Sequence, residues 1–306
     1  MPAVIQLRSK VRREDAEESF VGRMLTEDDF SVLLTGDAVV YKPNGEKLCA
    51  LIKGGIPEDV IAAATPALHS LKSWKTDNRA TYTASAAKRT RVNSDGTLDR
   101  QMRAEKVSSA IVGYYNRTGR HPFCRETAFT AHHVEKWETV VPLAQAVDKL
   151  FKRHAPMQHH RQAERAAQCR HEYIIPGTTF STLTVNNTVR AGCHTDRGDF
   201  KPGMGCISAI RIGCWTGHFL VFPEYGVAAD LQDGDLLLFD SHAMHGNTPM
   251  RALAAGECTC DGDHVDDVVT ERISIVYYLR EKMIECGPPE MEAERAKAKY
   301  GGISET

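Results

Sequence analysis

Short apolar runs separated by turn residues dominate the chain after Tyr173. Gly, Pro, Asn and Asp stand between these runs, which is typical of strands joined by tight turns. Several such runs at close intervals predict an antiparallel sandwich or jelly roll. The last run is long enough to form a strand through the middle of the sheet. The runs are TTFSTLTVNN, GCISAIRIG, HFLVFPEYGVAAD, GDLLLFDS and ERISIVYYLR.

The chain before Tyr173 predicts helices as well as strands. In residues 1–70, the stretch AVVYKPNGEKLCALIKGG predicts a hairpin across Pro43-Asn44-Gly45, followed by a helix near Pro57. A second helix is expected to begin at Pro142, because proline is favoured in the first helical turn. Apolar side chains then recur at helical spacing, so this helix should pack one face on the sheet. They are Leu143, Ala146, Val147, Leu150 and Phe151.

The composition is that of a globular protein with a sizeable core. Of the 306 residues, 42% are hydrophobic and 25% are charged. The formal net charge of -2 does not by itself indicate a polyanionic partner. The N-terminus lacks the apolar segment of a signal peptide, and no uninterrupted apolar run approaches the roughly 18 residues that a membrane span needs. We therefore expect neither a signal peptide nor a membrane span.

Nine cysteines are spread through the chain, an odd number in a protein large enough to need no disulfides. We therefore expect a reducing cytosolic compartment. Cys258 and Cys260 are the only close pair, and without a second pair they are weak support for a zinc site. Adding His264 to these two cysteines gives an equally weak second metal site.

One segment, residues 71–106, has nine basic and four acidic side chains, a local excess of +5. It contains few large aliphatic residues. It is either a solvated loop or a segment that contacts phosphates, because cationic loops neutralise a nucleic-acid backbone without reading its sequence.

A His-x-Asp motif follows one of the predicted strands. Extended structure places His194 and Asp196 on the same side, so both can bind one ion. A third ligand can come from GDLLLFDSHAMHGN, which contains His242 and His245 just after another apolar strand. We favour His245, because the Gly-Asn-Thr-Pro turn after it suits a ligand at a strand end, and His242 remains the alternative. Two imidazoles and one carboxylate leave the opposite coordination positions open, as in non-haem Fe(II) oxygenases.

The last long strand carries polar side chains on one face. Arg272, Ser274, Tyr278 and Arg280 share this face with Val276, so it either lines a pocket or faces solvent. With the His-x-Asp motif and a distal histidine in the same chain, the pocket is favoured. A buried arginine needs a partner, and a dicarboxylate cosubstrate matches the two-pronged guanidinium.

The order of these motifs resembles the Fe(II)/2-oxoglutarate dioxygenase superfamily, and the finer matches resemble its TET/J-binding-protein branch, which oxidises the 5-methyl group of pyrimidines in DNA. The stretches that carry the resemblance cover roughly residues 173–282. They are FSTLTVNNTVRAGCHTDRGDF, FLVFPEYGVAADLQDGDLLLFDSHAMHGNTP and ERISIVYYLR.

The resemblance implies the cofactors Fe(II), 2-oxoglutarate and O2, and a role for each matching residue. The iron ligands would be His194, Asp196 and His245. Arg272 and Ser274 would hold the distal carboxylate of 2-oxoglutarate, which His218 could also approach.

Base flipping would bring the target pyrimidine to the iron, because a stacked base cannot reach a buried metal. Tyr278 falls where the branch keeps an aromatic residue that stacks on the flipped base. Asp199 and Arg280 stand where the branch has an Asn and a His that contact the base, and Asn186 is a further substrate-binding candidate. The candidate contacts to the DNA backbone are Lys88, Arg89, Arg91, Arg100 and Arg103, with Arg117, Arg120, Arg125, Arg161, Arg165 and Arg170 as further candidates.

We therefore expect a DNA dioxygenase that converts 5-methylcytosine to 5-hydroxymethylcytosine. The main alternative is a thymine hydroxylase that forms 5-hydroxymethyluracil, and a wider one is a hydroxylase of a small molecule or a protein side chain. An alternative from another class is a catalytically silent DNA-binding module. No membrane and no obligate protein partner are expected, and the location would be the cytoplasm of a bacterial or phage-infected host, or the nucleus of a eukaryote.

The expected fold is α+β, with a double-stranded β-helix (jelly roll) core, backing helices and an N-terminal α/β elaboration. Residues 1–125 would form the elaboration, with its basic loop at 71–106, and residues 126–285 would form the dioxygenase core. Residues 286–306 would be a polar helix and tail.

Overall fold

The computed structural model describes residues 2–8, 20–76, 106–253 and 270–301. These residues form helices and β-sheets, so the predicted mixture of α and β structure is confirmed. No helix in the described ranges is long and apolar enough to cross a membrane. Some candidate residues lie outside the described ranges: Lys88, Arg89, Arg91, Arg100, Arg103, Cys258, Cys260 and His264.

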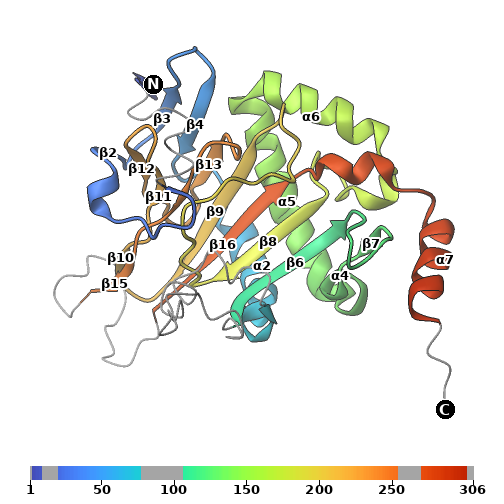
Figure 1. The fold of residues 1–306 in the computed structure, drawn as a ribbon. Coiled ribbons are helices and arrows are strands. Elements are labelled where there is room, and N and C mark those ends of the chain that lie inside the picture. Colours follow the sequence, from blue (N-terminus) through green and yellow to red (C-terminus); the bar gives the residue numbers. More distant parts are fainter. Residues whose placement is uncertain (1, 9–19, 77–105, 254–269, 302–306) are drawn as a thin grey trace, which may run out of the picture.

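The larger sheet contains ten strands, and their order differs from their order in the chain (Figure 1). β16 (Glu271–Tyr278) lies between β9 (Gly205–Ile212) and β8 (Thr182–Asn187) and is antiparallel to both. The last apolar run therefore does form a strand in the middle of the sheet. Beyond β9 come β13 (Leu236–Phe239), β4 (Lys47–Ile52), β3 (Ala38–Tyr41) and β1 (Ala3–Gln6); beyond β8 come β6 (Val107–Tyr115) and β5 (Lys75–Thr76), and β7 (Arg125–Glu126) pairs with β6.

A smaller sheet packs against one face of the larger one. Phe222 and Val227 from the smaller sheet share a buried apolar cluster with Leu237 and Phe239 from the larger sheet. An apolar layer thus lies between the two sheets. The smaller sheet has the order β14 (Gly246–Asn247), β11 (Leu220–Phe222), β12 (Val227–Ala229) and β2 (Val32–Leu34), and β10 (Trp215–Gly217) pairs separately with β15 (Met250–Ala252).

Helices cover the other face of the larger sheet (Figure 1). Ile273, Ile275 and Tyr277 on β16 belong to the apolar cluster that contains the buried faces of α2 and α5. The residues between them, among them Arg272 and Ser274, therefore face the smaller sheet. The helices are α2 (Glu58–Ser70), α4 (Ala128–His132), α5 (Val134–His154), α6 (Pro156–Gln168) and α7 (Pro289–Tyr300), with 3-10 turns η1 (Glu27–Asp29), η2 (Leu71–Ser73), η4 (His171–Tyr173) and η5 (Glu281–Glu285).

The N-terminal strands extend both sheets. β4 pairs with β13 in the larger sheet, and β2 runs parallel to β12 in the smaller one. The predicted hairpin across Pro43-Asn44-Gly45 is confirmed, since it joins the antiparallel strands β3 and β4. The predicted helix near Pro57 is confirmed as α2. The boundary at residue 125 stays a prediction.

The predicted start of the second helix at Pro142 is wrong. α5 begins eight residues earlier, at Val134, and Pro142 lies inside it. A proline within a helix removes one backbone hydrogen bond. The helix continues through it because Trp137 and Val140, which precede the proline, are buried in the same apolar cluster as Leu143 and Phe151.

The expectation that the cysteines need no disulfides is also wrong. Cys124 and Cys286 form a disulfide across a sequence separation of 162 residues. It joins the strand entry at β7 to the segment that precedes α7. Spacing along the chain gave no sign of this pair, because its two members meet only through the packing of α7 beside β6 and β7.

Candidate active site

His194, Asp196 and His245 lie together, and His245 packs against Phe222 of the smaller sheet and Phe239 of the larger one. One ligand atom from each lies within 4.8 Å of the others. His194 Nε2 is 3.6 Å from Asp196 Oδ1, and His245 Nε2 is 3.5 Å from Asp196 Oδ2. The carboxylate therefore lies between two imidazole nitrogens, which is a donor set for a divalent metal ion.

Backbone pairing holds these three residues in place. His194 and His245 face each other across an antiparallel bridge, with N–O distances of 2.9 and 3.0 Å between their backbones. The backbone N–H of Asp196 donates to the carbonyl of Ser241 at 2.8 Å. Backbone hydrogen bonds thus join the two chain segments that carry the ligands, so the positions of the ligands are fixed by the main chain.

The imidazole rings are oriented by hydrogen bonds on their other nitrogens. His194 Nδ1 lies 2.8 Å from the carbonyl of Gly192, and His245 Nδ1 lies 2.9 Å from the carbonyl of Ala243. A carbonyl can only accept, so each Nδ1 carries the hydrogen and each Nε2 presents its lone pair. This is the arrangement that protein metal sites use to fix ligand orientation.

The surroundings of His245 favour positive charge. Burial alone would lower the pKa of His245, but the hydrogen bond and the charge of Asp196 outweigh it and raise that pKa above its ordinary value. The ring also packs edge-on against Phe239, with centroids 5.1 Å apart. A cation placed among the three side chains would meet the same attraction.

Arg272 is buried on the face of β16 that is turned toward the smaller sheet, and the described residues do not give it a complete set of partners. Its exposed fraction is 2%, and its Nη2 atom has no hydrogen-bond partner among the described residues. Burial lowers its pKa to about 10, against a raising effect from Asp230. Burying a guanidinium removes its water, and this costs free energy when the protein does not replace that water with enough hydrogen-bond acceptors. A bound anion would supply the missing acceptors.

His218 lies close enough to Arg272 for the two to influence each other electrostatically. Burial, followed by the charge of Arg272, lowers the pKa of His218 to about 3, so the ring is neutral. Neither ring nitrogen of His218 has a hydrogen-bond partner within the described ranges, and its backbone φ is 55°, a left-handed conformation. Of five buried side-chain atoms without a partner in the described part of the chain, three belong to Arg272 and His218. These donors and acceptors fit a dicarboxylate such as 2-oxoglutarate.

Two other candidates lie on the same wall as Arg272. Ser274 is buried on β16, and Asn186 stands directly opposite it on β8. Ser109 donates a hydrogen bond of 2.6 Å to Asn186 Oδ1, which fixes the amide. Tyr278, further along the same face, is buried, and its hydroxyl lies 2.8 Å from Thr184 Oγ1.

Asp199 and Arg280 form a pair. They meet in an isolated antiparallel bridge, and Arg280 Nη1 lies 3.7 Å from Asp199 Oδ1. Sequence analysis missed two further contacts: Arg280 Nε donates to Asn116 Oδ1 at 2.9 Å, and its guanidinium lies 4.8 Å from the centre of the Tyr115 ring. No local signal could have found these, since β6 is more than 160 residues away in the chain.

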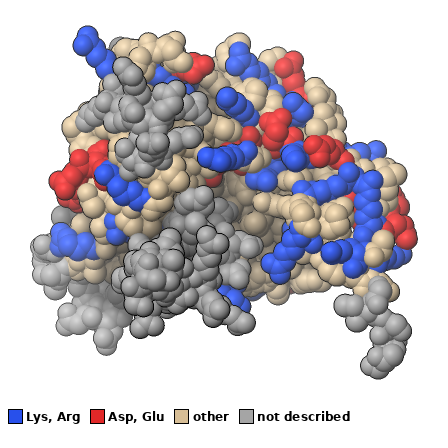
Figure 2. Space-filling model, viewed as in Figure 1, with Lys and Arg blue, Asp and Glu red and all other residues tan. Residues whose placement is uncertain are grey.

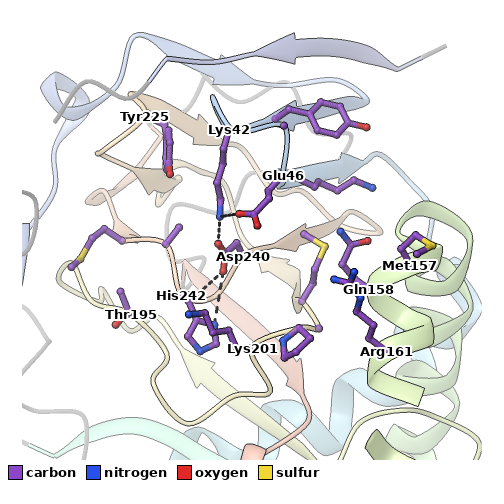
Figure 3. Close-up of a pocket in the computed structure, with 18 of the residues that line it drawn as sticks. Lys42, Glu46, Met157, Gln158, Arg161, Thr195, Lys201, Tyr225, Asp240 and His242 are labelled. Atoms are coloured by element: carbon purple, nitrogen blue, oxygen red, sulfur yellow. Dashed lines mark hydrogen bonds and ion pairs between the residues drawn. The ribbon is translucent and has the colours of Figure 1, made fainter. Parts of the chain in front are cut away.

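His242, the alternative third ligand, lies outside the triad and lines a neighbouring cavity of about 720 Å³ (Figure 3). Its backbone N–H donates to Asp240 Oδ1 at 2.9 Å, and Lys42 bonds the other oxygen of that carboxylate. The geometry therefore favours His245 for the triad. The cavity is bordered by the β3–β4 hairpin, the start of α6 and the loops that follow the triad residues, including Glu46, Met157, Gln158, Arg161, Thr195, Lys201 and Tyr225.

A 2-His-1-carboxylate triad beside a buried, incompletely paired arginine defines the class of non-haem Fe(II) oxygenase sites. Residues 110–281 match the Tet_JBP family, the oxygenase domain of the 2OGFeDO superfamily. The chain belongs to this family, which confirms the resemblance predicted from its motifs. Enzymes of the superfamily use Fe(II), 2-oxoglutarate and O2, as predicted, and the triad and the pocket fit these cofactors.

Two thymine dioxygenases are similar in sequence to much of this chain. The bifunctional helicase and thymine dioxygenase JBP2 of Leishmania major is 34% identical over 272 residues, which cover 87% of this chain and 21% of that protein. Thymine dioxygenase JBP1 of Trypanosoma brucei brucei is 35% identical over 175 residues, covering 56% and 19%. The chain therefore spans about a fifth of the length of these relatives.

A solved structure shares the fold. NgTET1, in complex with 5mC DNA, superimposes with a TM-score of 0.57 at 12% identity and covers 92% of each chain. At this identity the likeness concerns the fold alone.

Proposed function

We propose that this chain is an Fe(II)/2-oxoglutarate-dependent dioxygenase that hydroxylates the 5-methyl group of thymine in DNA to give 5-hydroxymethyluracil. The observation that carries the proposal is the triad with Arg272 beside it, in a chain whose relatives are named thymine dioxygenases. The first choice in the sequence analysis, 5-methylcytosine, becomes the second candidate, because the likeness to NgTET1 supports only the fold.

One set of residues would bind the metal and another would bind the cosubstrate. His194, Asp196 and His245 would hold Fe(II) on one face and leave the opposite face open. Arg272 would bind the distal carboxylate of 2-oxoglutarate, with Ser274 beside it and His218 as a neutral neighbour. When bound, these cofactors with O2 supply the oxidant that a methyl group requires, and 2-oxoglutarate becomes succinate and CO2.

The substrate base would be flipped out of the duplex. Tyr278 would lie against its face, and Asn186 would border it from β8. Arg280 carries only donors and Asp199 only acceptors, so together they match the O4 and N3–H of thymine. With the two roles exchanged, the same pair would also match the amino group and N3 of 5-methylcytosine, so the names of the relatives are what support thymine as the first candidate.

We also propose that the two facing sheets are the walls of a double-stranded β-helix. Two observations support this architecture: the apolar layer that the two sheets share, and the packing of the triad residue His245 against both of them. Residues 126–285 would then hold most of the core, and residues 286–306 would be an appendage.

The experiment is nucleoside mass spectrometry after incubating the protein with Fe(II), ascorbate and 2-oxoglutarate on two DNAs, one unmethylated and one carrying 5-methylcytosine. We expect 5-hydroxymethyluracil from both. If 5-hydroxymethylcytosine formed on the methylated DNA and no 5-hydroxymethyluracil formed on either DNA, the substrate would be 5-methylcytosine, the second candidate. No oxidised base, with slow succinate formation, would exclude DNA as the substrate and retain the oxygenase.

A control variant separates an enzyme from a silent binding module. Asp196→Ala removes the carboxylate that lies between the two imidazoles. We expect turnover to fall by at least about 100-fold while DNA binding is largely kept. A binding module would show no turnover to lose in the unmodified protein.

A further inference from the structure

Tyr115 and Arg125 form a cross-strand pair at the end of the β6–β7 ladder. They are directly opposite each other in the antiparallel register, and the Arg125 guanidinium lies 5.3 Å from the centre of the Tyr115 ring. Arg280 also lies over this ring, at 4.8 Å. One aromatic ring therefore carries two guanidinium groups, an arrangement with net positive charge.

Arg125 has an unused donor. Its Nη1 atom is buried and has no hydrogen-bond partner among the described residues. Burial lowers the pKa of Arg125, and the charged or polar groups that also act on it are Tyr115, Tyr300 and Arg120, with no carboxylate among them. The site therefore presents a half-buried cation that no carboxylate among the described residues neutralises.

Three of the other candidate arginines are already paired. Arg117 forms an ion pair with Glu292, Arg170 with Glu172 and Arg165 with Glu281. Among the further phosphate-contact candidates, Arg125 is a half-buried cation for which the described part of the chain provides no acidic partner. Figure 2 shows basic side chains gathered on this face over the region of β6, β7 and the segment before α7.

The position of Arg125 connects it to the proposed base pocket. Arg280, which shares the Tyr115 ring, pairs with Asp199, three residues after Asp196 of the triad. The main chain around Arg125 is anchored, because Cys124 forms the disulfide with Cys286. The guanidinium of Arg125 is therefore held close to Arg280 and, through Arg280, to the segment that carries the triad residue Asp196.

We propose that Arg125, over the Tyr115 ring, binds a backbone phosphate of the DNA strand that carries the target base. This inference rests on the proposed function. A phosphate oxygen would accept from the half-buried guanidinium and supply the negative charge that the described residues do not place there. Such a contact positions the strand and reads no sequence.

The test is DNA binding by the whole chain with Fe(II) and 2-oxoglutarate present and O2 excluded, measured by fluorescence anisotropy at several NaCl concentrations. For Arg125→Gln we expect binding about 10-fold weaker at low salt, from loss of a charge-assisted hydrogen bond. The slope of log affinity against log salt should fall by about 1, since one phosphate contact disappears. The loss should be the same for duplexes of different sequence.

Two variants control this test. Arg125→Lys keeps the charge and should keep the salt slope. Arg153→Gln removes an equal charge from an exposed position on α5 and should leave both the slope and the affinity unchanged. A wild-type slope in Arg125→Gln would overturn the inference, even if the protein oxidises thymine normally. Lack of oxidation with a reduced slope would instead count against the proposed function alone.

A free phosphate ion is the other source of the same chemistry. If Arg125 held one, inorganic phosphate without DNA would raise the melting temperature of the wild type and not that of Arg125→Gln. That result would overturn the assignment to DNA.

Discussion

Two buried charged residues, Arg272 and Glu292, show opposite ways of keeping a charge inside this protein. Arg272 is 2% exposed and Glu292 is 1% exposed, so both have left water almost completely. Arg272 has a donor without a partner. Glu292 accepts hydrogen bonds from the backbone N–H groups of Cys124 and Gly287, at 2.8 and 2.7 Å, and also pairs with Arg117 and Arg295.

The difference separates a structural charge from a binding charge. Glu292 ties α7 to the loop that enters β7, and nothing remains for a ligand to add. Among the described residues, Arg272 lacks a full set of hydrogen-bond acceptors, and the nearby His218 has no partner for either ring nitrogen. A buried charge that the protein itself satisfies holds the fold together, whereas one that it leaves unsatisfied marks a ligand site.

The largest expected effect is on cosubstrate binding. Arg272→Met should raise the KM for 2-oxoglutarate by about 100-fold, because it removes a desolvated charge that pairs with a carboxylate. The free energy of unfolding should not fall, since the removed charge has no complete protein partner. Steady-state kinetics and urea unfolding check both parts.

Arg211 provides the matched control for this variant. It lies opposite Arg272 in the β9–β16 ladder, and its guanidinium bonds Gln232 and the carbonyl of Trp215. Arg211→Met should therefore lower stability and change the KM for 2-oxoglutarate little. A large rise in KM for both variants would remove the distinction between the two arginines.

The next effect is on stability at the other buried charge. Glu292→Leu should lower the free energy of unfolding by about 3–5 kcal/mol, because its partners lose their acceptor in a buried place. The KM for 2-oxoglutarate should stay unchanged. Glu294→Gln, on the exposed side of the same helix, should cost less than about 0.5 kcal/mol. Equal losses in the two variants would contradict the structural role of Glu292.

A smaller effect is expected from the disulfide beside Glu292. Cys124→Ser with Cys286→Ser should lower the free energy of unfolding by about 2–4 kcal/mol under oxidising conditions. With a reducing agent present, the wild type should move toward the stability of the double variant. Thermal unfolding of both proteins with and without reductant measures this, and a wild type indifferent to reductant would argue against the bond.

The smallest effect concerns the pH dependence caused by His218. Its pKa is about 3 in the folded protein and about 6.5 when unfolded, so below pH 6.5 the unfolded state binds one more proton. Stability is therefore lost as pH falls from about 6.5 toward 3, by about 1.4 kcal/mol per pH unit. His218→Asn, which tolerates the left-handed backbone, should flatten the curve of unfolding free energy between pH 6.5 and 5. A curve parallel to the wild type would show that folding does not lower the pKa of His218.

The sequence by itself determined the features that depend on local periodicity. The two-residue spacing of His194 and Asp196 and the alternation along β16 follow from strand geometry, so the shared faces could be predicted. The family could be predicted for the same reason, because its motifs consist of short spacings in a fixed order.

Only the tertiary structure decided which distant residues meet. It brought His245 rather than His242 to Asp196, joined Asp199 to Arg280, and left Arg125 with no acidic partner in the described part of the chain. It also put the N-terminal strands into both sheets and carried α5 through Pro142. These outcomes depend on which faces are buried against which neighbours. The free energy of that burial comes from contacts between residues far apart in the chain, which no local sequence pattern records.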